Sequence, residues 1–295
     1  MRSARTAQSA AQIWDIATPA RPGLLPGVSM AGFRARTGDP VDMSVVPYPA
    51  VTVAFDLGEQ PFGVDAPDGG LHRGSIVAGL AADGLRGHGR AIECLQIRLS
   101  PPVAHAVFGA SVELGGAVVS LDDLWGRDGT RVQEQVRAAR TWPDRFAIAE
   151  AALVRRHATG RAVDPEVAFV WREMVTHLGG IRVEPLAAEI GWSRKRLWSR
   201  FRSQTGLTPK RAAQLIRFDH AAHRLAAGHG AARVAAEIGY ADQSHLHRDV
   251  RAFAGVTPAA VSHAPWLAID DVAWAAPAYL AGTPLRAAGR AELRG

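Results

Sequence analysis

Apolar residues recur at helical spacing in the C-terminal third of the chain, and the pattern occurs twice. The segment Leu186-Ala-Ala-Glu-Ile-Gly-Trp192 returns 48 residues later as Val234-Ala-Ala-Glu-Ile-Gly-Tyr240. Further along, Gly206-Leu-Thr-Pro209 returns as Gly255-Val-Thr-Pro258. In each copy the apolar positions predict a short helix that ends at a glycine, where a residue with a Cβ atom would resist the turn. A second helix then runs to the next glycine, so the simplest interpretation is two helix-turn-helix units.

The second helix of each unit, expected over residues 194–204 and 243–253, has an apolar face and a polar face. Ser193 and Asp242 are placed to cap these two helices. The inward residues are Leu197 and Phe201 in the first helix, and Leu246, Val250 and Phe253 in the second. The outward residues are Arg194, Lys195, Trp198, Ser199 and Arg202 in the first helix, and Gln243, Ser244, His247, Arg248 and Arg251 in the second.

Positive charge is concentrated in the same part of the chain. Residues 166–263 contain 14 Lys and Arg against 8 Asp and Glu, whereas the rest of the chain contains 20 of each. The run from Arg194 to Arg202, which includes Arg196 and Arg200, has five cations and no acid. Localised positive charge is typical of a surface that binds a polyphosphate, although a charge run alone also fits a solvated helix face.

The outward side chains have the chemistry to contact DNA. Trp198 can pack on sugar or thymine methyl groups, while Lys195 and Arg202 reach base edges or phosphates. Gln243 has the amide geometry that reads adenine, and Arg248 has the fork that suits guanine. The alternative is that Trp198 covers a neighbouring helix and the polar side chains are only solvated.

Short apolar runs separated by Gly, Pro and Asp predict strands in the first 160 residues. In one run Leu95, Ile97 and Leu99 alternate with Gln96 and Arg98, which predicts a half-buried strand. The expected strands cover residues 51–57, 75–80 and 92–99, and the expected helices cover 102–108, 130–140 and 144–156. A β-rich part followed by helices predicts a small barrel or sandwich packed on a helical connector.

The boundary between the two parts is expected near residues 158–165, because Asp164-Pro165 is typical of a helix cap followed by proline in the first turn. A helix over 166–178 would open the second part, and Gly179-Gly180 would end it. The expected fold class is α+β. A β-rich lobe with a helical connector covers 1–160, an all-α domain with two helix-turn-helix units covers 166–263, and an alanine-rich tail covers 264–295. In the tail, Trp266 and Trp274 are candidates to dock on the body, and no functional role is indicated.

Several classes of protein do not fit the sequence. The single cysteine, Cys94, lies inside a strand run and cannot form an internal disulfide or a multi-cysteine zinc site. No stretch reaches the roughly 18 apolar residues of a membrane span, and residues 1–20 contain no uninterrupted apolar signal segment, so a cytoplasmic location is the default. The close pair His245 and His247 would point to different helix faces, so neither a metal nor a cofactor is expected. There is no nucleophile elbow or phosphate-binding loop, and no enzyme is expected.

Residues from about 168 to 262 resemble the DNA-binding domain of the AraC/XylS family of bacterial transcription regulators. The resemblance rests on the two repeated motifs described above, together with Ser193, Leu197, Phe201 and Arg248. The chain departs from the family pattern at Leu246 and Val250, where phenylalanine is common, and after Pro258, where the usual aromatic-arginine ending is missing. That family joins its two helix-turn-helix units by a long central helix, which would be 212–227 here. The resemblance implies base-facing roles for Lys195, Trp198, Ser199, Gln243, Ser244, His247 and Arg248. Phosphate or flanking contacts are expected from Arg194, Arg200, Arg202 and Arg251.

The N-terminal part is similar to the sensory domains of a group of AraC-type regulators common in actinobacteria. The motifs that carry this similarity are Val77-Ala-Gly79-Leu80, Ile97-Arg-Leu-Ser-Pro-Pro102 and Leu121-Asp-Asp-Leu-Trp-Gly126. Asp122 and Asp123 are expected to cap the turn around Trp125. A buried structural role is favoured for Trp125 over stacking on a ligand.

Together these features predict a sequence-specific regulator of transcription whose two recognition helices enter successive major grooves, about 34 Å apart. Its activity is expected to be modulated through the N-terminal domain. The alternative is that this domain serves only protein contacts, and an enzyme tethered to DNA is a distant third. The expected partners are double-stranded DNA, RNA polymerase if the chain activates transcription, an effector of unknown identity, and a second copy in a homodimer. No membrane is expected as a partner.

Overall fold

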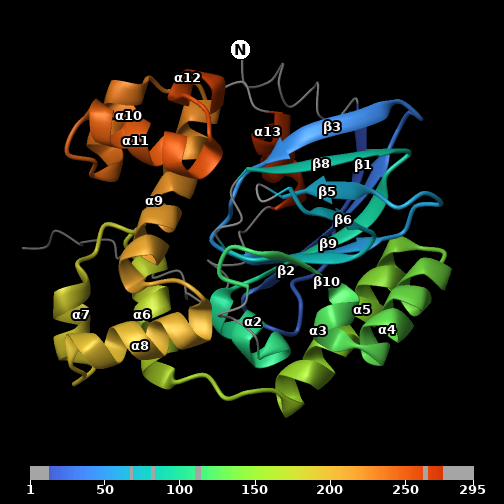
Figure 1. Ribbon diagram of the computed structural model, residues 1–295, viewed down its shortest axis with the longest axis horizontal. Coiled ribbons are helices and arrows are strands. Elements are labelled where there is room, and N and C mark those ends of the chain that lie inside the picture. Colours follow the sequence, from blue (N-terminus) through green and yellow to red (C-terminus); the bar gives the residue numbers. More distant parts are fainter. Residues whose placement is uncertain (1–12, 67–68, 81–83, 110–113, 262–264, 275–295) are drawn as a thin grey trace, which may run out of the picture.

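The computed structural model describes residues 13–66, 69–80, 84–109, 114–261 and 265–274. Two antiparallel sheets form an N-terminal lobe, and most helices lie outside it (Figure 1). The larger sheet has six strands in the order β1 (Trp14–Ala17), β2 (Val28–Ala35), β9 (Glu93–Leu99), β4 (Val51–Asp56), β7 (Ile76–Ala78) and β10 (Val118–Ser120). The smaller sheet has four strands in the order β3 (Pro40–Val45), β8 (Leu85–Arg90), β5 (Gly63–Asp65) and β6 (Leu71–Arg73).

Strand β9 lies between β2 and β4 and is buried on both faces. Ile97 pairs with Met30 on β2 and with Val53 on β4. On one face Leu95, Ile97 and Leu99 are fully buried, as the alternating pattern predicts. The other face was expected to be polar and solvated, but Cys94 and Arg98 are only 4% and 7% exposed there. This part of the prediction is wrong, because the smaller sheet covers the face that alternation alone assigns to water.

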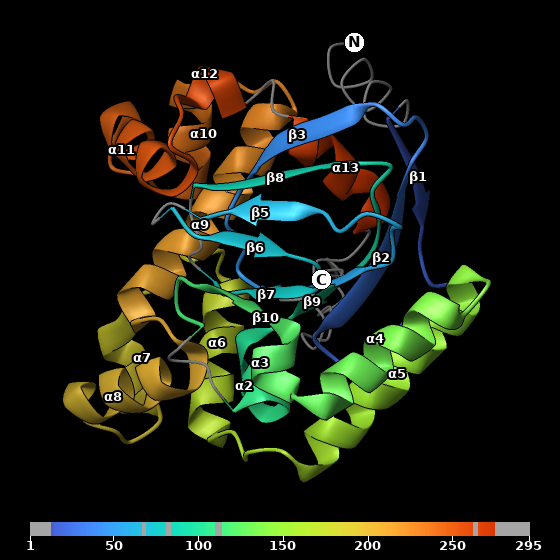
Figure 2. The same ribbon diagram turned by 45° about the vertical axis from the view of Figure 1, so that its right-hand side comes forward.

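Four helices cover one face of the six-stranded sheet: α2 (Pro101–Phe108), α3 (Leu121–Trp125), α4 (Arg127–Ala138) and α5 (Trp142–Thr159) (Figure 2). The ring of Trp125 is buried, stacks on Phe108 at 5.6 Å between centroids, and lies 4.8 Å from the guanidinium of Arg156. The expected structural role of Trp125 is confirmed. The expected cap is wrong, because the hydroxyl of Ser120 accepts the hydrogen bond from the main-chain N–H of Asp122, which already lies in the first turn.

The C-terminal part is all helical, so the predicted fold class is confirmed. Its helices are α6 (Pro165–Thr176), α7 (Val183–Glu189), α8 (Arg194–Thr205), α9 (Pro209–Ala226), α10 (Ala231–Ile238), α11 (Gln243–Ala254) and α12 (Pro258–Val261). A last helix, α13 (Pro265–Ala273), returns to the N-terminal lobe, where it contacts β1 and β3 (Figure 1). Trp274 docks there and is 6% exposed, whereas the side chain of Trp266 lies outside the described residues. Within the described residues, no helix combines the length and the apolar character needed to cross a membrane.

Gly79, in the first motif of the N-terminal similarity, follows β7 and has a packing role. A Cβ atom built on this glycine would lie 1.3 Å from the main-chain oxygen of Leu114. Two chain segments therefore approach at Gly79 more closely than any side chain allows. The expected strands and helices of the lobe are present as β4, β7, β9, α2, α4 and α5. The prediction did not include the other strands that the structure describes, which are short, rich in glycine or mixed in polarity.

Candidate nucleic-acid interface

Helices α7 and α8 form the first helix-turn-helix unit. Gly191, in the turn between them, has φ of 67°, a conformation that favours glycine. The hydroxyl of Ser193 accepts a hydrogen bond of 3.2 Å from the main-chain N–H of Arg196, so Ser193 is the helix cap, as predicted. Leu197 and Phe201 are fully buried beneath α8. The apolar face of α8 is thus fixed, and this determines which side chains point outward.

The outward face of α8 carries one aromatic ring, one hydroxyl and two cations. Lys195, Trp198, Ser199 and Arg202 are all exposed, and their spacing of three and four residues places them along one side of the helix. Trp198 is 37% exposed, which makes it one of the few large apolar side chains left open to water. Its ring lies at the surface and does not fill the core.

Two other arginines of α8 already have acidic partners. Arg200 donates two hydrogen bonds to Asp164, at 2.6 Å from Nε and 2.8 Å from Nη2, and this pair holds the pKa of Asp164 below its usual value. Asp164 occupies the N-cap position of α6 with proline in the first turn, as predicted, and its side chain bonds to Arg200 instead of making a capping bond. The exposed Arg194 lies 3.4 Å from Glu184. A phosphate near Arg200 would have to compete with the carboxylate of Asp164.

Helices α10 and α11 repeat the same construction. Gly239 ends α10 with φ of 79°, and Asp242 caps α11 by accepting a 2.7 Å hydrogen bond from the main-chain N–H of His245. Both features were predicted from the repeat. The inward residues Leu246, Val250 and Phe253 are fully buried. Phe253 stacks on Phe218 of α9 with 5.0 Å between ring centroids, which fixes α11 against the central helix.

All five side chains expected on the outer face of α11 are exposed: Gln243, Ser244, His247, Arg248 and Arg251. Gln243 and His247 lie 3.4 Å apart through their Nε2 atoms, and Arg248 donates a 3.4 Å hydrogen bond to the main-chain oxygen of Ser244. These contacts lie within one helix. They leave the amide and the guanidinium at the surface, where a base edge can be reached.

Helix α9 sets the distance between the two units, which lie toward its opposite ends (Figure 1). Its 18 residues, at a rise of about 1.5 Å each, give a length of about 27 Å, comparable to the roughly 34 Å of one DNA turn. Glu237 of α10 pairs with both Arg224 of α9 and Arg233, which lowers the pKa of Glu237 to about 2. The second unit is therefore held against α9 by the ion pair between Glu237 and Arg224 as well as by the stacking of Phe253 on Phe218.

A family model described as a helix-turn-helix domain matches residues 186–264. The match begins at the first residue of the repeated motif and spans both units. This region is an AraC-type helix-turn-helix domain. An AraC-type domain makes the chain a DNA-binding transcription regulator.

The chain is also similar to two kinds of solved structure. ToxT from Vibrio cholerae is 11% identical with a TM-score of 0.45, over 82% of this chain and 98% of that chain. The AraC-like transcriptional activator CuxR is 16% identical with a TM-score of 0.27, over 68% of this chain and 84% of that chain. No curated protein matches the sequence.

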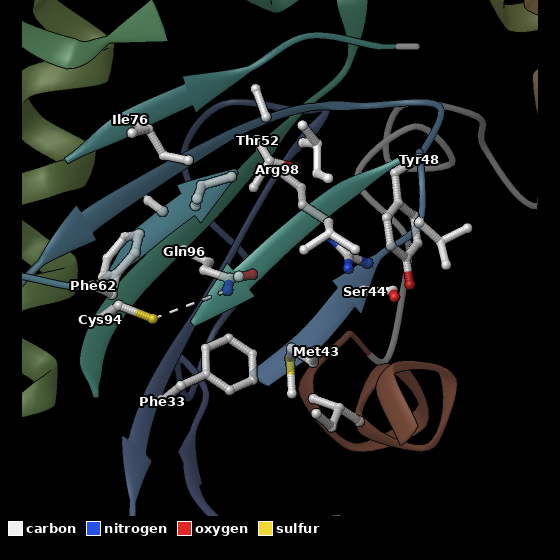
Figure 3. A pocket seen from close by; sticks show the side chains of 18 of the residues that line it. Phe33, Met43, Ser44, Tyr48, Thr52, Phe62, Ile76, Cys94, Gln96 and Arg98 are labelled. Atoms are coloured by element: carbon white, nitrogen blue, oxygen red, sulfur yellow. Dashed lines mark hydrogen bonds between the residues drawn. The ribbon is translucent and has the colours of Figure 1, made fainter. Parts of the chain in front are cut away.

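A second candidate site lies in the N-terminal lobe of the regulator, where the two sheets line a partly open cavity of about 180 Å³ (Figure 3). Its wall is mostly apolar and includes Phe33, Met43, Tyr48, Phe62 and Ile76. The polar lining residues are Ser44, Thr52, His88, Gln96, Arg98 and Asp270. Burial raises the pKa of Cys94, on the same wall, to about 12, so its thiol stays protonated near neutral pH. No group of three or more His, Cys, Asp or Glu among the described residues could hold a metal ion.

The sequence reasoning missed this cavity and the residues that line it. Its wall combines strands from both sheets with Ile269, Asp270 and Trp274 of the C-terminal segment. The only signal in the sequence was the polar alternation of Gln96 and Arg98, and alternation does not distinguish a face turned to water from a face turned to a cavity.

Proposed function

We propose that the chain reads an asymmetric DNA site with α8 and α11 in successive major grooves, and that a small molecule in the N-terminal cavity modulates this activity. The first half is carried by one observation. The two capped helices α8 and α11 each have an exposed polar face, and they lie toward opposite ends of α9. The length of α9, about 27 Å, is comparable to the roughly 34 Å of one DNA turn. One copy of the chain therefore has two recognition helices at a fixed spacing.

Within this proposal, the exposed residues form two groups, those expected to contact base edges and those expected to contact phosphates. The base-facing set is Lys195, Trp198, Ser199, Gln243, Ser244, His247 and Arg248, all of them exposed. Arg194, Arg202 and Arg251 are placed to meet phosphates beside the reading faces. Arg200 has a different first partner, because the bidentate pair with Asp164 fixes α8 to the start of α6. We therefore expect Arg200 to contribute less to DNA affinity than Arg202.

Replacing Arg248 by alanine should weaken binding to a specific site by about 1–3 kcal/mol and relax the base preference at one position. The matched change, Arg202→Ala, should weaken specific and random DNA alike and reduce the slope of log affinity against log salt by about one. The site is first selected from a random duplex library with the unaltered chain, and affinities are then measured by fluorescence anisotropy. Equal losses on selected and random DNA for Arg248→Ala would show that this arginine contacts only the backbone.

The cavity favours a neutral, apolar ligand. Its one buried cation, Arg98, is already matched by Asp270, with 3.0 Å between Nη2 and Oδ1. A ligand with a carboxylate would bring a further, unmatched charge into a buried site, which is costly. A dry apolar cavity of about 150 Å³ binds benzene, so the 180 Å³ here suits a small aromatic or a short aliphatic molecule.

Indole should bind the full chain and stabilise it against unfolding by about 2.7 kcal/mol at 100 times its dissociation constant. Thermal unfolding with increasing indole measures this, and indole-3-carboxylate serves as the charged control that should bind far more weakly. Ala54→Leu, which adds bulk to a buried wall position, should remove the response. No stabilisation by indole or by any neutral aromatic, with association that depends on chain concentration, would instead support a lobe that serves only protein contacts.

A further inference from the structure

One side of the cavity is formed by α13 and Trp274, the residue that follows this helix. Helix α13 lies beyond the DNA-binding domain in sequence, yet Ile269 and Trp274 are 8% and 6% exposed and line the cavity of the N-terminal lobe. They belong to the same apolar cluster as Phe33 of β2 and Val64 of β5. A molecule in the cavity would therefore touch α13 as well as the two sheets.

A buried ion pair holds α13 in this position. Arg98 of β9 and Asp270 of α13 have side chains that are 8% and 6% exposed. The guanidinium of Arg98 lies 3.5 Å from the ring centroid of Tyr48 and 4.1 Å from that of Trp274. One cation thus contacts a carboxylate and an aromatic ring of the same C-terminal segment. Moving this segment away would expose both charges of a pair that is packed between rings.

The other oxygen of the same carboxylate faces the DNA-binding domain. Oδ2 of Asp270 lies 3.4 Å from Nε2 of His223 on α9, an ion pair when the imidazole is protonated. The ring of His223 is held from its other side, because Nδ1 donates to the main-chain oxygen of Asp219 at 2.8 Å, so Nε2 carries a hydrogen toward Asp270 in the protonated imidazole. Helix α9 joins the two helix-turn-helix units, so Asp270 touches the cavity wall through Arg98 and the central helix through His223.

We propose that α13 couples the cavity to the DNA-binding domain through Asp270, whose carboxylate contacts both Arg98 and His223. A ligand that fills the cavity packs against Ile269 and Trp274 and stabilises the docked position of α13. The carboxylate of Asp270 is shared, so the same docked position also fixes the end of α9 that carries His223. An unfilled cavity leaves α13 less firmly held, and the last turns of α9 lose part of their support. This inference rests on the proposed function only in taking ligand binding as the signal, because the contacts of Asp270 with Arg98 and His223 are present without a ligand.

Hydrogen–deuterium exchange of the full chain tests the coupling without any ligand. Asp270→Asn and Trp274→Ala should each make the amides of residues 220–227 exchange at least about tenfold faster, while the amides of β9 show that the lobe remains folded. Val272→Ser is the matched control on the same helix, because Val272 is 51% exposed and should leave α9 unchanged. Ile269→Ala gives a second cavity-side variant if Trp274→Ala does not fold. Unchanged exchange in α9 for folded Asp270→Asn and for a folded cavity-side variant would overturn the proposal.

Indole then separates this proposal from the ligand function. In the unaltered chain and in Val272→Ser, indole should slow exchange both in β9 and in residues 220–227. In Asp270→Asn, indole should slow exchange in β9 alone. Slowing in α9 that persists in Asp270→Asn would overturn the role of Asp270. If indole protects neither segment, the proposed ligand class fails, and the variants without ligand still decide whether α13 is coupled to α9.

Discussion

Replacing Phe253 by alanine should lower the free energy of unfolding by about 3–5 kcal/mol and abolish binding to DNA. The ring is fully buried, stacks on Phe218 at 5.0 Å, and has the guanidinium of Arg211 3.8 Å from its centroid. Removing it leaves a void between α11 and α9 that two backbone-rigid helices cannot close. Urea unfolding followed by circular dichroism measures the loss of stability, and anisotropy on the selected site measures the loss of binding.

Trp198→Ala is the matched control, because it also removes a large aromatic ring from a recognition helix. Trp198 is 37% exposed, so its loss should lower the free energy of unfolding by only about 1–2 kcal/mol, clearly less than the loss of the fully buried Phe253. It should nevertheless weaken binding to the selected site, since the ring lies on the proposed reading face. A stable Phe253→Ala chain that still binds DNA would show that α11 does not need its contact with α9.

The C-terminal domain could be predicted from sequence because its determinants are local. Each cap acts over three residues, from Ser193 to Arg196 and from Asp242 to His245. The inward and outward faces follow from helical period, and the repeat supplies the same information twice. Asp164 also occupies the N-cap position that the sequence predicts, but its side chain makes no capping bond. There, a bidentate bond from Arg200, 36 residues away, replaces a weaker capping bond.

The N-terminal lobe was only partly predictable, because strand pairing is not local. Strand β9 pairs with β2 and with β4, and neither partner follows it in the chain. Strand β8, Leu85-Arg-Gly-His-Gly-Arg90, contains two glycines and no clear alternation, so nothing in its own residues indicates a strand. The cavity depends on both sheets and on α13, and a motif search along the chain does not bring these together. The contact between Arg98 and Asp270 spans 172 residues.

Replacing Arg98 by alanine should lower the free energy of unfolding by about 3–5 kcal/mol, because it removes the buried cation that neutralises the carboxylate of Asp270. The two side chains are 8% and 6% exposed, so water does not take the place of the lost partner. The change also removes the cation that lies between the rings of Tyr48 and Trp274. Urea unfolding of the full chain measures the effect, and Arg86→Ala provides a control, since Arg86 pairs with Asp42 at the surface and its loss should leave the stability nearly unchanged.

The double variant Arg98→Met with Asp270→Leu distinguishes a buried ion pair from a packing contact. Replacing both charges by apolar groups of similar size is often neutral, so this variant should be more stable than Arg98→Ala by several kcal/mol. His223 then loses its contact with the carboxylate, but its side chain is 31% exposed and can be solvated. The double variant should therefore keep the lobe folded while α9 loses its link to α13. A loss in free energy of unfolding below about 1 kcal/mol for Arg98→Ala would mean that water reaches Asp270. Helix α13 would then not be docked tightly enough on the cavity for the proposed coupling.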